Sequence, residues 1–178
     1  MRELVKTYHG ASLAMKLENG FRRSISGSGY AGLFMNGFPP FRLKYSGSHR
    51  GIVMINDSGA SSIDAVYYSL NKIDSPLVWI IWNDEANAPF EELDLAVLQK
   101  VKKIIVVGKS YFKIDYLFGN DLDVAEAESI DHAVAMALAA AGPGECVLFS
   151  PATGKIKGIK NKKQLFDLIE EKFKTRTG

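Results

Sequence analysis

The stretch "GIVMINDSGASSIDAVYYSLNKIDSPLVWIIW", residues 51–82, holds two apolar runs separated by a segment that begins with helix-capping residues. The runs "GIVMI" and "PLVWIIW" are continuous rather than alternating, which is typical of strands buried on both faces. Between them, Ser61 precedes "SIDAVYYSLNKI" and is predicted to cap a helix, with Asp64 placed as in a capping box. A buried strand, a helix and a second buried strand in this order predict a parallel sheet.

The alternation of helical and strand-like segments continues to the end of the chain. The sequence predicts a helix in 89–99 with Pro89 in its first turn, a strand in 102–108, a short helix or loop in 109–119, a strand in 122–127, a helix capped by Ser129 in 129–141, a strand in 145–150 and a helix in 162–173. Residues 38–178 are therefore predicted to form a Rossmann-like, doubly wound α/β domain. Its sheet should be mostly parallel, with helices on both faces.

In such a sheet, ligands bind outside the carboxyl ends of the strands. Four loops follow predicted strands at that edge: "NDSGASS", "WNDEANAP", "GKSYF" and "SPATGKIK". Trp79 is expected in the core, whereas Trp82 stands at a strand end and could line a cleft there.

Residues 1–37 differ in composition from the rest of the chain, because they are rich in Gly, Ser and aromatic residues. Asn19-Gly20 lies between two strand-like runs and predicts a β-hairpin extension. An isolated hairpin needs a surface to cover it, either on this domain or on a second copy of the chain. In the second case the extension is a homodimerisation element. A second hairpin is predicted over 41–55, with its turn at residues 46–48.

The bulk composition argues against several classes of protein. The chain has 178 residues and a net charge of +2, so no global field favours nucleic acid. No apolar run reaches the roughly 18–20 residues that span a bilayer, and the N-terminus does not read as a signal peptide. The single cysteine, Cys146, sits in an apolar strand-like run and is expected to be buried and inert. We therefore expect a cytoplasmic protein without a nucleic-acid or membrane partner.

Neither a metal site nor a nucleophile triad is indicated by the sequence. His9, His49 and His132 are far apart and lack zinc-ligand spacing. Ser150 follows a strand but is not in a Gly-x-Ser-x-Gly elbow.

The loop "SPATGKIK" before the last helix invites comparison with a phosphate-binding loop. A Walker-type loop needs Gly, four residues, then Gly-Lys-Ser/Thr, but Phe149 and Ile156 stand where the first Gly and the hydroxyl residue belong. Two interpretations of the neighbouring lysines stay open, namely an anion site or a solvated helix start. These lysines are Lys155, Lys157, Lys160, Lys162 and Lys163.

Several stretches together resemble a known family. They are residues 51–81, "LQKVKKIIVVGKS", "SIDHAVAMALAAAGPGECVLFSPA" and "IKNKKQLFDLIEEKF". In this order they resemble the C-terminal domain of the Mur ligases, in particular the branch that adds D-glutamate to UDP-N-acetylmuramoyl-L-alanine in peptidoglycan synthesis. The resemblance implies a Rossmann-like domain that closes over ATP, with its magnesium, and over the incoming amino acid in a three-domain ligase.

The resemblance also assigns candidate site residues. Arg42 and Asp57 match nucleotide contacts of the family. The alternative is structural: Arg42 would be a solvated strand residue, and Asp57 would cap the loop or helix that follows it. Gly59 and Ala86 stand where the family has lysines. Residues on the side of the incoming amino acid are Ser61, Asp84, Ser150, Lys155, Asn161 and Lys162.

Two functions follow as expectations. The first is a ligase C-terminal domain that is not catalytic alone, since the chain as given has no ATPase domain; its partners would be a small-molecule amino acid or nucleotide. The second is a degenerate stand-alone relative that acts as a non-catalytic binding or oligomerisation module. The retained Arg42 and Asp57 favour the first, and the missing lysines favour the second.

Overall fold

The computed structural model describes residues 40–85 and 88–176, and the predicted hairpin within residues 1–37 and Ala86 lie outside these ranges. The elements are β1 (Lys44–His49), β2 (Ile52–Asn56), α3 (Ile63–Lys72), β3 (Leu77–Trp82), the 3₁₀ helix η1 (Phe90–Leu93), α4 (Asp94–Lys100), β4 (Val101–Val107), α5 (Tyr111–Phe118), β5 (Asp123–Glu126), α6 (Ile130–Ala140), β6 (Cys146–Phe149) and α7 (Lys162–Lys174). The segment predicted as a short helix or loop in 109–119 is thus the helix α5.

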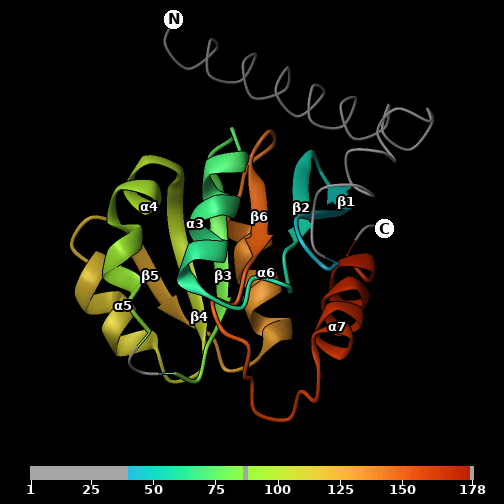
Figure 1. The fold of residues 1–178 in the computed structure, drawn as a ribbon. Helices are drawn as coiled ribbons and strands as arrows, with labels where there is room; N and C mark the ends of the chain where they lie inside the picture. The colour runs from blue at the N-terminus through green and yellow to red at the C-terminus, as the bar shows by residue number, and fades with distance from the viewer. Residues whose placement is uncertain (1–39, 86–87, 177–178) are drawn as a thin grey trace, which may run out of the picture.

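The strands form one sheet in the order β1-β2-β6-β3-β4-β5 (Figure 1). The pairs β2–β6, β6–β3, β3–β4 and β4–β5 are parallel, and only the edge strand β1 is antiparallel to its neighbour. The last strand in the chain, β6, inserts between β2 and β3. The predicted mostly parallel α/β sheet is therefore confirmed.

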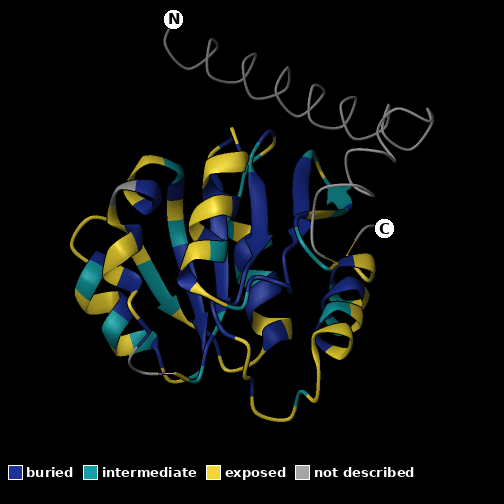
Figure 2. Cartoon of the chain, in the orientation of Figure 1, coloured by how far each residue is buried: buried dark blue, intermediate teal, exposed yellow. Residues whose placement is uncertain are grey.

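Two hydrophobic clusters cover the two faces of this sheet. On one face, α3, η1, α4 and α5 pack through residues such as Val66, Phe90 and Phe118. On the other face, α6 and α7 pack through residues such as Val134 and Phe173. Figure 2 shows the central strands as buried and the outward surfaces of the helices as exposed. This arrangement is the predicted double winding, and it explains why the central strands are apolar on both faces.

Both tryptophans lie in β3. Trp79 is fully buried, as predicted, and its indole Nε1–H donates to the carbonyl of Ser150 at 2.9 Å. Trp82 is half-buried and packs against the α6 and α7 side of the core.

The predicted turn of the β1–β2 hairpin was wrong. His49 pairs with Ile52, so the turn residues are Arg50 and Gly51, which both have positive φ, of 50° and 79°. Two central residues with positive φ form the kind of tight turn that suits a two-residue hairpin. Ser46 and Gly47 lie within β1, at a bulge between Tyr45 and Gly47 where Gly47 has a φ of 122°. The Ser-Gly-Ser sequence therefore marks a bulge, which also uses glycine for positive φ.

The predicted helix cap was displaced by one residue. The N-cap of α3 is Ser62 rather than Ser61, because the Ser62 hydroxyl accepts the backbone N–H of Ala65 at 3.3 Å. Asp64 lies in the first turn, where its negative charge suits the helix dipole. The other predicted cap, Ser129, is confirmed by its bond from the His132 backbone N–H.

Candidate functional site

Three loops meet at the carboxyl ends of β2, β6 and β3. Asn56 pairs with Phe149, and Phe149 pairs with Ile80, so these strand ends lie side by side. Backbone bonds extend the register past the strands, from Asp57 N–H to the Phe149 carbonyl and from Ser150 N–H to the Ile80 carbonyl. The chain leaves β2 toward α3 on one face and leaves β6 toward α7 on the other. The site is thus at a point where the connections diverge, which is where open α/β sheets bind ligands.

The first cluster in this site is built on Asp57. Its Oδ1 accepts Arg42 Nε at 2.6 Å and the Leu43 backbone N–H at 3.0 Å. Its Oδ2 accepts the hydroxyls of Ser69 at 2.6 Å and Ser150 at 2.9 Å. Asp57 therefore ties together the segment before β1, the loop after β6 and helix α3.

Asp57 and Arg42 are directed at each other rather than at solvent. The Asp57 side chain is 0% exposed and that of Arg42 is 10% exposed. Arg42 Nη2 also donates to the Ala65 carbonyl at 2.7 Å and to Ser69 at 2.9 Å. Burial raises the pKa of Asp57, and the donors Ser69, Arg42 and Ser150 oppose that rise. Arg42 is thus not a solvated strand residue, and the role of this pair as nucleotide contacts stays a prediction.

A second group of predicted residues meets across the cleft. Lys162 Nζ donates to the Ser61 hydroxyl at 3.1 Å, which joins the start of α7 to the loop after β2. A Cβ built on Gly154 would lie 3.5 Å from the Ser61 Cβ, so the "SPATGKIK" loop also packs against Ser61. Ser61 and Lys162 are therefore in contact, and their role in binding an amino acid stays a prediction.

The remaining predicted residues stand around this pair. Asp84 Oδ2 accepts the backbone N–H of Lys157 at 3.1 Å and so joins the loops after β3 and β6. Asn161 is the N-cap of α7, where its side chain accepts the Gln164 N–H at 2.9 Å. Lys155 is exposed on the loop after β6, with its backbone bonded to Thr153. Asn161 thus has a clear structural task, and a substrate contact by any of the three stays a prediction.

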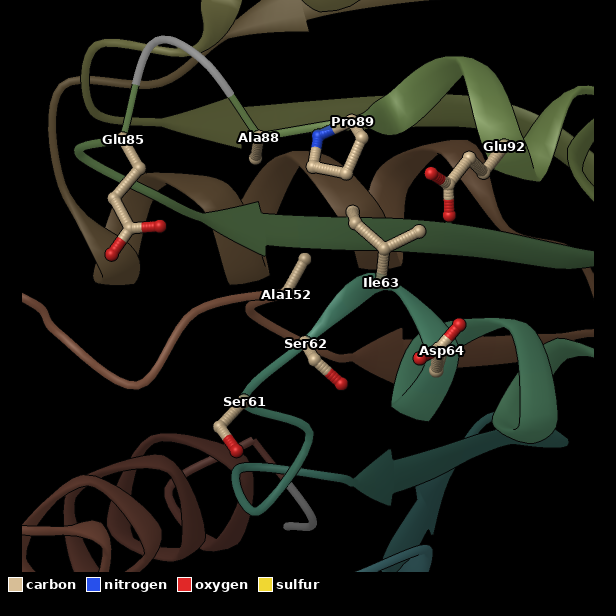
Figure 3. Close-up of a pocket in the computed structure, with 9 residues that line it drawn as sticks. All are labelled: Ser61, Ser62, Ile63, Asp64, Glu85, Ala88, Pro89, Glu92 and Ala152. Atoms are coloured by element: carbon tan, nitrogen blue, oxygen red, sulfur yellow. The ribbon is translucent and has the colours of Figure 1, made fainter.

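A pocket of about 620 Å³ opens beside Ser61. Figure 3 shows residues 61–64 on one side and Glu85, Ala88, Pro89 and Glu92 on the other. Ala152, which has a φ of 59°, completes the lining from the loop after β6. The lining residues are Ser61, Ser62, Ile63, Asp64, Glu85, Ala88, Pro89, Glu92 and Ala152. Three of them are acidic, so the pocket suits a group that carries a positive charge or donates hydrogen bonds.

Sequence reasoning missed Ser69, the hydroxyl that contacts both Asp57 and Arg42. Ser69 lies on the buried side of α3 with Ile63, Val66 and Leu70. A serine on the apolar side of an amphipathic helix is the signal that could have found it, because a buried hydroxyl needs a polar partner.

A polar network behind the site was also missed. Glu170 of α7 accepts hydrogen bonds from Ser46, from Lys44 Nζ at 2.9 Å and from Asn56 Nδ2 at 3.0 Å. Burial favours the neutral form, but these three hydrogen bonds outweigh it and lower the pKa of Glu170 below its usual value. The network holds Asn56, the residue before Asp57.

Two negative observations apply to residues 40–85 and 88–176. In this part of the chain, no group of three or more His, Cys, Asp or Glu side chains could hold a metal ion. No helix within the same ranges has the length and apolar character needed to cross a bilayer. Arg42 Nε and Asp57 Oδ1 are bonded to each other in this structure.

Two solved structures share the fold. FolC of E. coli in complex with ADP has a TM-score of 0.54 and 14% identity, over 80% of this chain and 34% of that chain. MurF ligase of Thermotoga maritima in complex with ADP has a TM-score of 0.50 and 11% identity, over 78% of this chain and 32% of that chain. These two likenesses show that the chain has the α/β fold of the matched parts of those proteins.

Curated relatives define the relationship more narrowly. The UDP-N-acetylmuramoylalanine–D-glutamate ligase of Cytophaga hutchinsonii is 31% identical over 123 residues, which are 68% of this chain and 27% of that protein. The ligase of the same name from Salinibacter ruber is 29% identical over 162 residues, 90% of this chain and 34% of that protein. The resemblance predicted from the sequence is thus confirmed: the chain is related to the Mur ligases, and within them to the D-glutamate ligases.

The chain spans about a quarter to a third of the length of these relatives. No family model matches it.

Proposed function

We propose that this chain supplies the C-terminal, substrate-closing part of an ATP-dependent carboxylate–amine ligase in cytoplasmic peptidoglycan synthesis. Its pocket beside Ser61 receives the incoming amino acid. The sequence contains no Walker loop, so a loop of that kind would be supplied by another domain of the ligase. Arg42 and Asp57 add nucleotide contacts from this chain.

The observation that carries this proposal is the hydrogen bond from Lys162 to Ser61, a residue that lines the pocket. Lys162 Nζ and Ser61 Oγ are 3.1 Å apart, although the two residues are 101 positions apart in the chain. An ammonium at this position can bind a carboxylate, and the acidic lining from Asp64, Glu85 and Glu92 can bind an ammonium group. Together they match the ammonium group and one carboxylate of an amino acid.

The test is a titration of the full chain with D-glutamate, followed by calorimetry and by amide chemical shifts. We expect saturable binding at millimolar ligand, with shifts at Ser61, Ser62 and Glu92. Lys162→Ala should weaken binding about tenfold, or about 1.4 kcal/mol.

Lys163→Ala is the matched control, because Lys163 is the adjacent lysine but bonds Asp167 one helical turn away at 2.5 Å. Its affinity for D-glutamate should equal that of the unaltered protein. Equal losses of affinity in both variants would count against an amino-acid site at Ser61. So would a titration that does not saturate when D-glutamate is raised to about 20 times the expected dissociation constant.

One observation favours the second candidate, a non-catalytic binding or assembly module. Position 59, where the family has a lysine, has no room for a side chain, since a Cβ there would lie 2.8 Å from Arg42 Cδ. The adjacent Arg42–Asp57 pair is bonded internally and buried. A site that lost its lysine in this way is suited to a structural role.

Sedimentation equilibrium of the full chain tests this candidate. An assembly module of this kind, with residues 1–37 as its dimerisation element, should exceed the monomer mass of 19.6 kDa at micromolar concentration. A monomer at 200 µM that also binds D-glutamate would favour the ligase proposal instead.

A further inference from the structure

Gly59 lies directly beneath residues 40–43, the segment that precedes β1. Its backbone N–H donates to the Phe41 carbonyl at 2.8 Å. A Cβ on Gly59 would lie 2.8 Å from Arg42 Cδ, 2.9 Å from the Phe41 carbonyl oxygen and 3.0 Å from the Pro40 carbonyl oxygen. Two of these three neighbours are backbone atoms, so rotation of a side chain cannot relieve the contact. Only glycine therefore allows residues 40–43 to lie where they do.

The same segment carries backbone strain. Phe41 and Leu43 have φ values of 69° and 45°, and residues other than glycine seldom adopt this left-handed region. Strained residues persist only where their surroundings hold them in place. Here the conformation is held by the bonds from Arg42 Nε and Leu43 N–H to Asp57 and by the Gly59–Phe41 backbone bond.

We propose that residues 40–43 form a latch that closes over Gly59 and, while closed, withholds Arg42 and Asp57 from any ligand in the cleft. Three of its bonds end on the 57–59 turn, and Arg42 makes two more to α3 through Ala65 and Ser69. These bonds share the same few residues, so they break as a unit when the strained segment lifts. Opening would leave the Arg42 guanidinium without the acceptors Asp57, Ala65 and Ser69 and so free to bind an anion.

The latch makes ligand binding compete with an internal ion pair. An anionic group can reach Arg42 only by displacing Asp57 and Ser69. Its apparent affinity is therefore its affinity for the open form multiplied by the fraction of molecules that are open. The identity of that anion as a nucleotide phosphate rests on the proposed function, whereas the latch itself does not.

Hydrogen exchange of the full chain, followed at single amides, tests the latch. In Gly59→Ala we expect the Leu43 amide to exchange at least tenfold faster than in the unaltered protein, with exchange of the core amide of Ile80 unchanged. Gly142→Ala is the matched control, because a Cβ there has only ordinary contacts of 3.7 Å with Glu145. Its Leu43 amide should exchange at the unaltered rate. Equal Leu43 protection in folded Gly59→Ala and in the unaltered protein would overturn the proposal.

If Gly59→Ala does not fold, hydrogen exchange of the unaltered protein tests the latch instead. Leu43 and Gly59 amides that exchange together, and faster than the Ile80 amide, support a latch that opens locally. Amides that exchange only with Ile80, on global unfolding, overturn it.

A parallel titration with magnesium and ADP separates the latch from the proposed function. We expect Gly59→Ala to bind ADP at least fivefold more tightly than the unaltered protein. If neither protein binds ADP but Leu43 exchange still accelerates, the latch stands and the nucleotide assignment fails. If both bind ADP equally and Leu43 exchange is unchanged, the latch fails and the nucleotide assignment stands.

Discussion

The Glu170 carboxylate accepts a hydrogen bond of 3.0 Å from the side-chain amide of Asn56, and so joins α7 to the last residue of β2. The other end of the Asn56 amide, Oδ1, accepts the Ser58 backbone N–H at 3.1 Å. A helix at the end of the chain is thus connected, through one asparagine, to the turn that carries Asp57. The shape of the cleft therefore depends on how α7 is anchored.

We predict that Glu170→Gln destabilises the protein by about 1–3 kcal/mol at pH 7, because charge-assisted bonds from Lys44, Ser46 and Asn56 lose their anionic acceptor. Urea denaturation followed by circular dichroism measures the change. Glu171→Gln is the control, since Glu171 is the adjacent but exposed residue, and it should change stability by less than about 0.5 kcal/mol. Equal effects of the two variants would exclude the network as a source of stability.

The Glu170 contribution should also depend on pH. The pKa of this carboxyl is lower in the folded protein than its usual value of about 4.3. The unfolded chain therefore binds a proton before the folded protein does, so the contribution is complete above about pH 5 and is lost as pH falls through the folded pKa. Stability curves of the unaltered protein and Glu170→Gln should converge between about pH 5 and pH 3. A gap that stays constant over this range would contradict the assignment.

Removal of both partners of the buried ion pair should cost less than the sum of the two separate removals. Asp57→Ala leaves Arg42 without its anion and leaves Ser69 and Ser150 without an acceptor, so we expect a loss of about 3–5 kcal/mol. The double variant Arg42→Ala/Asp57→Ala should lose less than the sum of the two single changes, because the second change removes a group that is already unpaired. Strict additivity in urea denaturation would show that the two side chains do not interact energetically.

The displaced cap of α3 gives a prediction with a neighbouring control. Ser62→Ala removes the acceptor of the Ala65 N–H and should destabilise the protein by about 1 kcal/mol. Ser61→Ala removes only the exposed bond from Lys162 and should change stability by less than about 0.5 kcal/mol. Thermal melting of the two variants distinguishes them. A larger loss for Ser61→Ala would restore the cap predicted from the sequence.

The fold could be predicted from the sequence because its determinants are local. The strands β2, β3, β4 and β6 are continuously apolar, so both of their faces must be buried, and two layers of helices bury them. The serine caps mark where helices begin. The prediction of the hairpin turn was wrong for a local reason too. Arg50-Gly51 and Ser46-Gly47 each supply positive φ, and only the pairing between the strands shows which of them is the turn and which is the bulge.

The cleft could be predicted only in part. The sequence placed Asp57 and Ser61 at one edge of the sheet, because parallel strands end there together, and the family resemblance added Lys162. It did not show that Asp57 and Arg42 would satisfy each other, since their contact depends on the path of residues 40–43 over Gly59. Ser69 and Glu170 were missed because each lies in a helix with ordinary amphipathic spacing, and only tertiary packing brings their side chains to the strand ends.

Cys146 provides a probe of global opening. Its side chain is fully buried in the central strand β6, and burial raises the pKa of its thiol, which disfavours the reactive thiolate. The predicted inert thiol should therefore react with a disulfide reagent at pH 8 only as fast as the sheet opens, and without delay in 6 M guanidinium chloride. Because a latch that opens locally leaves β6 intact, Gly59→Ala should expose the Leu43 amide without accelerating the reaction of Cys146. Stoichiometric labelling of the folded protein within seconds would contradict the packing of β6 between β2 and β3.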